Sequence, residues 1–180
     1  MAPSLCRHVV VFRSTALVYR AFRRHKHSRR GKEPTEKGVS PLSTEDNKAY
    51  IRRGYEEGFY QRNLAVFDEL LAPDYVWHLA ETLVQGREPA KQLISRFLTA
   101  FPDGRYTIED MIAEGDRVVV RQTFRGTHQG DFMGIAPTGK QVSVTEIEIF
   151  RVANGKGVEN WTNSDDLGLL QQLGVVLSMG

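Results

Sequence analysis

The sequence is short of cysteine, and this scarcity limits the chemistry open to the chain. Its only cysteine, Cys6, lies in a basic N-terminal stretch. A disulfide framework or a cysteine metal site is therefore excluded in the rest of the chain. Long apolar runs are also missing, since none approaches the roughly 20 residues that span a bilayer. The apolar run 9–12 is too short, and Arg13 follows it too closely, for the core of a secretory signal.

Acidic residues are absent from the first 32 positions, although the whole chain has a formal net charge of only +2. These positions hold nine of the 24 basic residues. The remainder of the chain therefore has 15 basic and all 22 acidic residues, which gives it a formal net charge of −7. An acidic body argues against a nucleic-acid surface on it. The Arg-rich, amphipathic leader is typical of an organellar transit peptide, so we expect mitochondrial import. The basic run 23–30 leaves open a nuclear address or a nucleic-acid arm, and a cytoplasmic protein with a basic tail of no function is a third interpretation.

Length and composition indicate one domain after this leader. The chain has 180 residues, of which 41% are hydrophobic and 26% charged, enough for one packed core and too few for two comfortable ones. Pro34, Gly38 and Pro41 would break any helix at the end of the leader, which we interpret as a linker. We therefore divide the chain into a leader and linker over residues 1–40 and a folded domain over residues 43–176.

Apolar periodicity predicts helices in the first part of this domain. Ser43 can cap a first helix, whose buried stripe includes Tyr55. Asn63 can cap a short second helix that ends before Pro73. A third helix is expected from residue 87 to about residue 101.

Alternating β-branched and polar residues predict strands in the second part. We expect strands over residues 75–79, 106–113, 117–127, 141–152 and 156–163. The dipeptide between the last two, Asn154 and Gly155, tolerates the positive φ of a tight hairpin. Helices followed by hairpin-linked strands indicate an α+β fold, in which helices pack on one side of an antiparallel sheet.

The expected strand over residues 141–152 carries carboxylates where a sheet buries apolar side chains. Glu146 and Glu148 share a face with the strand's valines and its phenylalanine. A buried carboxylate is costly unless it is paired, hydrogen-bonded or neutralised through a raised pKa. This conflict suggests a cavity lined by ionisable groups. The alternative is that both glutamates form cross-strand ion pairs with Arg121 or Arg125.

His78 and His128 are candidate proton partners for these carboxylates. Each lies near an end of an expected strand, where a hydrogen-bonded residue at the surface or rim is the simpler interpretation. No histidine spacing resembles a metal site, so we expect no metal. The glycine-rich segment 126–139 lacks the lysine and hydroxyl residue that end a phosphate-binding loop, and it is better interpreted as a lid or a connection between strands.

Several segments carry a resemblance to a known family: residues 55–57, 63–76, 101–103, 126–139 and 167–174. In this order and with similar spacing, the chain from about residue 47 to residue 174 resembles the SnoaL-like polyketide (ester) cyclases of the nuclear-transport-factor-like superfamily. The resemblance implies a cone-shaped α+β barrel, with three N-terminal helices packed on a curved, mainly antiparallel sheet that encloses a pocket, and a short C-terminal helix. It also implies a homodimer and acid–base chemistry without a cofactor on an apolar carbonyl compound or polyketide-like ester.

The resemblance further implies a catalytic base, but the chain departs from the family pattern there. In the antibiotic-pathway cyclases an aspartate on the last strand removes a proton next to a carbonyl, and the matching position here is Thr162, whose hydroxyl cannot serve as that base. The position that matches a pocket histidine is Glu148. One hypothesis is therefore a cyclase or isomerase with Glu148 or Glu146 as base and His128 as proton partner. The other is a ligand-binding or dimerisation module that has kept the fold without the chemistry.

An apolar small-molecule ligand would contact further side chains of this pocket. We expect these to be Tyr55, Trp77, His78, Asn160, Trp161, Thr162 and Asp165. Asn160, Thr162 or His128 would donate a hydrogen bond to a developing enolate. The two tryptophans have a plainer interpretation as core residues, and Asp165 as the cap of a last helix.

Overall fold

The computed structural model describes residues 43–80 and 82–175, so the predictions for the leader, residues 1–40, lie outside the described residues. The elements follow one another as α2 (Thr44–Arg53), η1 (Gly54–Tyr60), α3 (Val66–Leu70), β1 (Leu71–Leu79), β2 (Thr82–Gln85), α4 (Arg87–Ala100), β3 (Arg105–Glu114), β4 (Arg117–Thr127), β5 (Gln141–Ala153), β6 (Lys156–Ser164) and α5 (Asp166–Leu173). Among the described residues, no helix is long and apolar enough to cross a membrane.

Side-chain caps begin two of the helices, as the sequence predicts. Ser43 Oγ accepts a hydrogen bond from Asp46 N at 3.1 Å, and Asp46 Oδ2 accepts one from Ser43 N at 3.0 Å. This capping box satisfies two N–H groups that the first turn of α2 leaves free. Asp165 caps α5 by accepting from Gly168 N. The predicted cap at Asn63 is wrong, because α3 begins after Ala65 without a side-chain cap.

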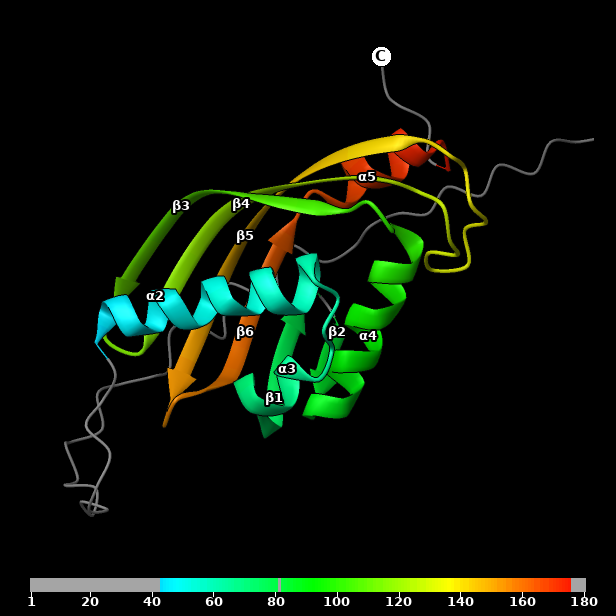
Figure 1. Cartoon of the computed structure of the whole chain (residues 1–180). Helices are drawn as coiled ribbons and strands as arrows, with labels where there is room; N and C mark the ends of the chain where they lie inside the picture. Colours follow the sequence, from blue (N-terminus) through cyan, green and yellow to red (C-terminus); the bar gives the residue numbers. More distant parts are fainter. Residues whose placement is uncertain (1–42, 81, 176–180) are drawn as a thin grey trace, which may run out of the picture. The chain divides into compact units, whose positions relative to one another are not determined.

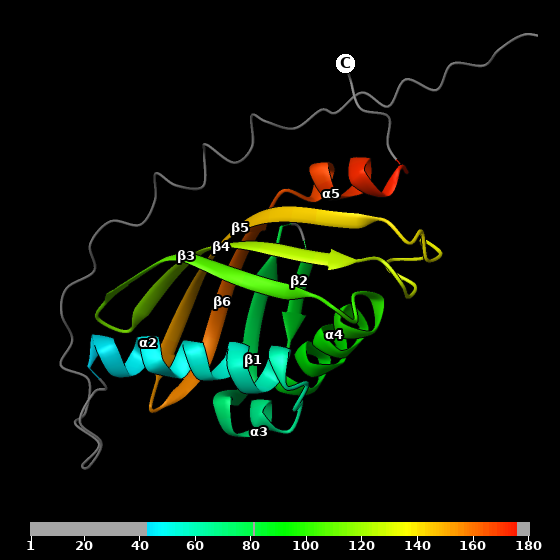
Figure 2. The ribbon, with the colours of Figure 1, turned by 45° about the horizontal axis from the view of Figure 1, so that its top comes forward.

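The six strands form one sheet in the order β2-β1-β6-β5-β4-β3. All neighbours are antiparallel except β1 and β6, which run parallel. The sheet is strongly curved, but its two edges do not meet, so it is an open cone rather than a closed barrel (Figures 1 and 2). The predicted α+β class, with a mainly antiparallel curved sheet, is confirmed.

Turn chemistry explains how the long hairpins form. Asn154 and Gly155 have φ values of 51° and 74°, which is the left-handed pair that a tight turn between β5 and β6 requires. The strands flanking this turn are each longer than predicted by one residue: β5 extends to Ala153, which pairs with Lys156 at the turn, and β6 extends at its far end to Ser164, which pairs with Glu146. β2 was not predicted, since four residues without clear alternation give no strand signal. It pairs with β1 only.

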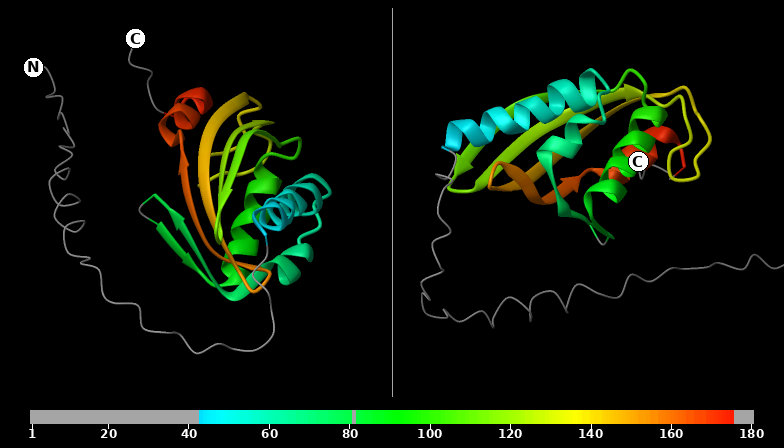
Figure 3. Two further views of the ribbon diagram at one scale, coloured as in Figure 1. Left: turned by 90° about the vertical axis from the view of Figure 1, so that its left-hand side faces the viewer. Right: turned by 60° about the horizontal axis from the view of Figure 1, so that its bottom comes forward.

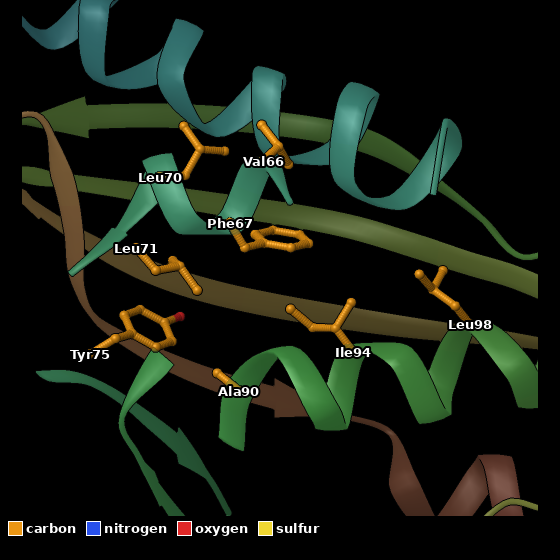
Figure 4. Close-up of a cluster of buried hydrophobic side chains, with 8 residues drawn as sticks. All are labelled: Val66, Phe67, Leu70, Leu71, Tyr75, Ala90, Ile94 and Leu98. Carbon is orange, nitrogen blue, oxygen red and sulfur yellow. The ribbon is translucent and has the colours of Figure 1, made fainter. Parts of the chain in front are cut away.

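Helices cover one face of the sheet. Figure 3 shows η1, α3 and α4 on the concave side, and α2 crosses the same side near the β3–β4 hairpin. A buried cluster between α3, β1 and α4 fills one end of the concave side (Figure 4). A second cluster, around Phe101 and Phe124, fills the other end and includes residues of α5. The site described next lies between the helices and the middle strands.

Candidate functional site

A cavity of about 70 Å³ lies between the helices and the concave face of the sheet. Its wall is mostly apolar and aromatic, with residues from α2, η1, α3, β1, α4, β5 and β6. The polar side chains in this wall belong to Tyr50, Tyr55, Tyr75, Trp77, Glu148 and Asn160. No lysine, arginine or histidine lies among its lining residues. An apolar hollow with a few convergent polar groups is the usual form of a small-molecule site.

One wall of the cavity is η1, a π-helix that continues directly from α2. Its residues Tyr55 and Phe59 stack with ring centroids 5.7 Å apart, and both line the cavity. Gly58 allows this wall to pack closely on α3, because a Cβ there would lie 2.3 Å from Cζ of Phe67. Single π-helical turns are rare and occur often at functional sites. The sequence predicted the helix and its buried Tyr55, but the periodicity gave no sign of the wider π turns.

Glu148 occupies the polar end of the cavity, on β5. It is 7% exposed and accepts hydrogen bonds from four side chains. The two short bonds come from Tyr55 Oη, at 2.7 Å from Oε2, and from Thr162 Oγ1, at 2.8 Å from Oε1. The two long bonds come from Gln122 Nε2, at 3.3 Å from Oε2, and from Asn160 Nδ2, at 3.4 Å from Oε1. Each carboxylate oxygen therefore has one strong and one weak donor.

Gln122 connects the two glutamates. Its Nε2 also donates to Glu146 Oε2 at 3.1 Å, so one amide group serves both carboxyl groups. Gln122 is a site residue that was not predicted, although it is an amide on the otherwise apolar face of its strand and lies directly opposite Glu146 in the β4–β5 register. That position on an apolar face was the signal that could have found it.

The alternative that arginines neutralise the glutamates is wrong. None of the ion pairs among the described residues involves Glu146 or Glu148. Arg121 instead pairs with Asp110 at 2.6 Å, and it is registered opposite Ile147, on the other face of the sheet. Arg125 is registered opposite Ser143 and therefore also points to that other face.

Burial without a cation shifts the pKa values of the site. Burial, together with the charge of Glu148, raises the pKa of Glu146 to about 8. Burial also raises the pKa of Glu148, and the hydrogen bonds from its four donors oppose this rise only in part. Burial and the charge of Glu148 raise the pKa of Tyr55 well above its ordinary value, so its hydroxyl keeps its proton as a donor. A carboxyl group with a raised pKa is poised for proton transfer near neutral pH.

Four of the predicted ligand contacts gather around Glu148. Tyr55, Trp77 and Asn160 line the cavity. Thr162 lies behind them, where its Oγ1 accepts from Trp77 Nε1 at 2.8 Å and donates its only hydrogen to Glu148. Because that hydrogen is already used, Thr162 acts on Glu148 and has no hydrogen left for an enolate.

Three other predicted residues lie away from the cavity. His78 and Trp161 stack on each other at 5.1 Å on the opposite face of the sheet, and His78 Nε2 lies 3.0 Å from Glu159 Oε1. Asp165 is occupied in the cap of α5. Alternation along β6 explains this division, since Asn160 and Thr162 face the cavity while Glu159 and Trp161 face the other way.

His128 is also separate from the two glutamates. It is completely buried at the far end of β4, against the rings of Phe101 and Phe132. Its Nδ1 accepts from Thr138 N at 3.2 Å, which fastens the segment after β4 back onto the strand end. His128 does not line the cavity, and it forms no hydrogen bond with Glu146 or Glu148. Among the described residues, no group of three or more histidine, cysteine, aspartate or glutamate side chains is placed to hold a metal ion.

These features define a cone-shaped α+β fold that is typical of proteins that bind small molecules. They are the curved open sheet, the helices on its concave side and the cavity with its carboxyl group. The family model for the SnoaL-like polyketide cyclases matches residues 49–173. The chain therefore belongs to this family. A search of the curated proteins gave no match.

Several solved structures resemble this chain in sequence and in fold. AclR from Streptomyces galilaeus, described as a candidate hydroxylase, is 32% identical with a TM-score of 0.69, over 77% of this chain and 87% of AclR. IdmH from Streptomyces antibioticus, a candidate polyketide cyclase, is 36% identical with a TM-score of 0.61, over 71% of this chain and 98% of IdmH. A candidate SnoaL-like polyketide cyclase from Jannaschia sp. CCS1 is 26% identical with a TM-score of 0.70, over 78% of this chain and 99% of that protein.

Proposed function

We propose that this protein is an acid–base catalyst that works without a cofactor, a cyclase or isomerase that acts on an apolar carbonyl compound or polyketide-like ester. One observation carries the proposal: Glu148 is a buried carboxyl group without a cationic partner in the wall of an apolar cavity. Such a group can remove a proton from the carbon next to a carbonyl when the substrate lies within hydrogen-bond reach. The chain belongs to the family of SnoaL-like polyketide cyclases, and this membership supports the same class of acid–base reaction.

The hydrogen bonds of Glu148 suggest where it takes up the proton. A carboxylate has about four lone-pair sites, and all four are occupied here. The bond from Asn160, at 3.4 Å, is the weakest of the four, and Asn160 itself lines the cavity. A substrate C–H can therefore approach Oε1 of Glu148 next to the weak bond from Asn160, while Thr162 and Tyr55 hold the carboxylate in place.

Tyr75 offers a further hydroxyl group at the cavity that can stabilise a developing enolate. It is 4% exposed and lines the cavity, and Figure 4 shows its hydroxyl directed into the interior of the cluster between β1 and α4. Burial raises the pKa of Tyr75, so the group stays protonated. A hydrogen bond between Asn160 and this hydroxyl opposes the rise only in part. Tyr75 was not among the predicted site residues.

Glu146 has a different part in this proposal. With a pKa of about 8 it holds its proton at neutral pH, so only one negative charge is present beside Gln122 when Glu148 is ionised. Two adjacent carboxyl groups that share a donor do not both ionise easily. Glu146 is absent from the cavity wall, so it tunes the base and does not contact the substrate.

Exchange of substrate protons with solvent tests the proposal before the natural substrate is known. Small β-keto esters and aryl ketones are incubated in D₂O with the protein, and deuterium uptake next to the carbonyl is followed by NMR. We expect Glu148→Gln to slow the exchange by at least about 100-fold, the lower end of general-base contributions. Glu114→Gln, at an exposed position of β3, is the matched control and should leave the rate unchanged. Equal rates for wild type and Glu148→Gln would refute the base.

A non-catalytic ligand-binding or dimerisation module is the second candidate. The observation in its favour is the saturation of Glu148 by four donors, together with a cavity far smaller than the roughly 300–1,000 Å³ of typical ligand sites. A module of this kind would bind compounds without accelerating exchange. Binding in a ligand screen, combined with exchange no faster than in buffer for every bound compound, would favour this candidate.

We also propose a homodimer formed through the convex face of the sheet. An unbroken row of registered residues crosses this face on all six strands: Leu83, His78, Trp161, Ile149, Val119 and Ile112. Its ends are open to solvent, since Leu83 is 49% and Ile112 67% exposed, and Ile147 beside the row is 47% exposed. Apart from His78 the row is apolar or aromatic, and an exposed apolar surface that extends across a whole sheet usually marks an interface.

The oligomeric state tests the proposed dimer directly. Light scattering after size exclusion should give twice the chain mass for the wild type and the chain mass for Ile147→Lys. Ile147→Val is the control that keeps the face apolar and should remain dimeric. A monomeric wild type at micromolar concentration would overturn this proposal and leave the proposed chemistry untouched.

For the leader we propose that residues 1–40 direct import into mitochondria, on the strength of their composition alone. A fluorescent reporter that carries these residues should co-localise with a mitochondrial dye. Replacement of Arg23, Arg24, Arg29 and Arg30 with glutamine should abolish this localisation, because import signals depend on positive charge. Diffuse cytosolic or nuclear fluorescence of the unaltered fusion would favour one of the other interpretations of the leader.

A further inference from the structure

Asn160 has a hydrogen-bond acceptor in the site without a partner. The residue is 2% exposed and lines the cavity. Its Nδ2 donates to Glu148, and its Oδ1 has no hydrogen-bond partner within the described part of the chain. The orientation of the amide is fixed by this contact, because the reversed amide would place Oδ1 against a carboxylate oxygen. The sequence suggested Asn160 as a donor, whereas the group that it leaves available is an acceptor.

A buried acceptor without a partner is unfavourable, and a bound molecule with a donor removes this cost. A ligand that offers only apolar atoms or acceptors would bury Oδ1 permanently unpaired. A site built in this way therefore binds a ligand that carries the donor more tightly than an analogue that lacks it.

The charges around the cavity restrict the ligand further. An anionic group would find no lysine, arginine or histidine among the lining residues, and it would face the carboxyl group of Glu148. An ammonium group would find the lone pairs of Glu148 already taken by Tyr55, Thr162, Gln122 and Asn160, so its desolvation would be offset by one neutral amide oxygen only. The aromatic wall favours a flat, apolar body in either case.

We infer that the cavity selects uncharged compounds that carry a hydroxyl or enol group, and that Asn160 Oδ1 accepts the hydrogen of this group. The inference rests on the proposed function in one respect, since it places the ligand in the same cavity. It goes further by giving the substrate class: neutral, apolar and donor-bearing, without carboxylate, phosphate or amine at the buried end. Asn160 is then a specificity-determining residue.

A matched set of single-ring compounds tests this inference on the full-length protein. Phenol, anisole, toluene, benzoate and benzylamine share the ring and differ in one substituent. Their affinities are compared by ligand-observed NMR titration at neutral pH. One additional hydrogen bond is worth up to about tenfold in affinity, so phenol should bind up to about tenfold more tightly than anisole and toluene. Benzoate and benzylamine should show no saturable binding.

Two variants assign the preference to Asn160. Asn160→Leu keeps the number and branching of the side-chain heavy atoms and removes the acceptor, so phenol should lose its advantage over toluene. Thr162→Val removes a donor to Glu148 without touching Oδ1, so the preference for phenol should persist. Circular dichroism checks that both variants fold. If Asn160→Leu does not fold, the relative affinities of phenol and anisole for the wild type still test whether the cavity prefers a ligand with a donor.

Three results would overturn the inference: equal binding of phenol and anisole, saturable binding of benzoate or benzylamine, or an undiminished phenol preference in folded Asn160→Leu. The inference and the proposed catalysis fail separately. Loss of the phenol preference leaves the proton-exchange assay informative. Unchanged exchange in Glu148→Gln leaves the ligand selectivity intact.

Discussion

Tyr55 and Glu148 lie 93 residues apart in the sequence and are joined by a hydrogen bond of 2.7 Å. Tyr55 lies on η1 and Glu148 on β5, so this bond ties the π-helix to the middle of the sheet across the cavity. A hydroxyl donates more strongly to an ionised carboxylate than to a neutral acid. The position of the helical wall and the ionisation of the candidate base are therefore linked.

Tyr55→Phe removes the hydrogen bond to Glu148 and keeps the aromatic ring with its packing. We expect the free energy of unfolding to fall by about 1.5–3 kcal/mol, the range for hydrogen bonds to charged groups. Urea unfolding at pH 8 measures the change. Tyr60→Phe, at the end of the same helix, is the control, because its hydroxyl donates to the neutral backbone oxygen of Tyr106 and should contribute only about 0.5–1.5 kcal/mol. Equal losses in the two variants would show that Glu148 carries no charge in the folded protein.

Glu146 gives folding stability a definite pH dependence. Its pKa is about 8 in the folded protein and near the ordinary value of 4.5 in the unfolded chain. The folded state thus holds a proton that the unfolded state has lost between these values, so this contribution is complete below about pH 4.5 and is lost as the pH rises through about 8. The slope approaches about 1.4 kcal/mol per pH unit at most.

Glu146→Gln should remove this slope, because glutamine keeps the contact with Gln122 and does not ionise. Urea unfolding from pH 5 to pH 9 measures the free energy of unfolding of both proteins. This free energy should fall with rising pH for the wild type more than for the variant, so that the wild type is the less stable of the two at pH 9. Parallel pH profiles for the two proteins would contradict the raised pKa of Glu146.

Gly58→Ala tests the packing of the π-helix. The new Cβ would lie 2.3 Å from Cζ of Phe67, so the ring must move, and we expect a loss of about 1–3 kcal/mol in the free energy of unfolding. Gly54→Ala is the matched substitution in the same element, where the nearest atom, Leu70 Cδ1, would be 3.6 Å away. Alanine there should be neutral or stabilising by about 0.5–1 kcal/mol. Thermal unfolding compares the two, and similar effects would mean that η1 adapts freely.

Thr162→Asp introduces the carboxylate that the family resemblance places at this position. It would lie beside Oε1 of Glu148, where the Thr162 hydroxyl now donates at 2.8 Å. Two carboxylates this close share one proton, so the variant should be destabilised strongly at pH 8 and much less at pH 4. Thr162→Val removes the hydroxyl without adding charge and should show little such pH dependence. A variant as stable as Thr162→Val at pH 8 would mean that the site accommodates two charges.

Much of the fold follows from local signals. The capping box at Ser43 and the turn at Asn154 and Gly155 fix element boundaries through short-range hydrogen bonds and backbone conformation, and the sequence displays both directly. The position of Glu148 on an apolar face predicted its burial. These features depend on neighbours within a few residues or on simple alternation.

The remainder depends on contacts that no local pattern encodes. The four donors of Glu148 come from η1, β4 and β6, and only the sheet register brings them together. His78 and Trp161 were grouped with the cavity residues because strand alternation fixes which residues share a face but does not say which face is covered. The pairing of His128 with Thr138 depends on a loop whose path the sequence leaves open.

The parallel pairing of β1 with β6 bears on how the chain reaches its native state. Leu71 is registered with Gly157 and Leu79 with Thr162. β1, which forms one side of the cavity, therefore pairs with a strand that is synthesised some 80 residues later. The hairpins from β3 to β6 can assemble from neighbouring segments, whereas β1 must bridge a long loop to join them. A nascent chain that stops before β6 cannot form the cavity, and ligand binding should therefore appear only after β6 has left the ribosome.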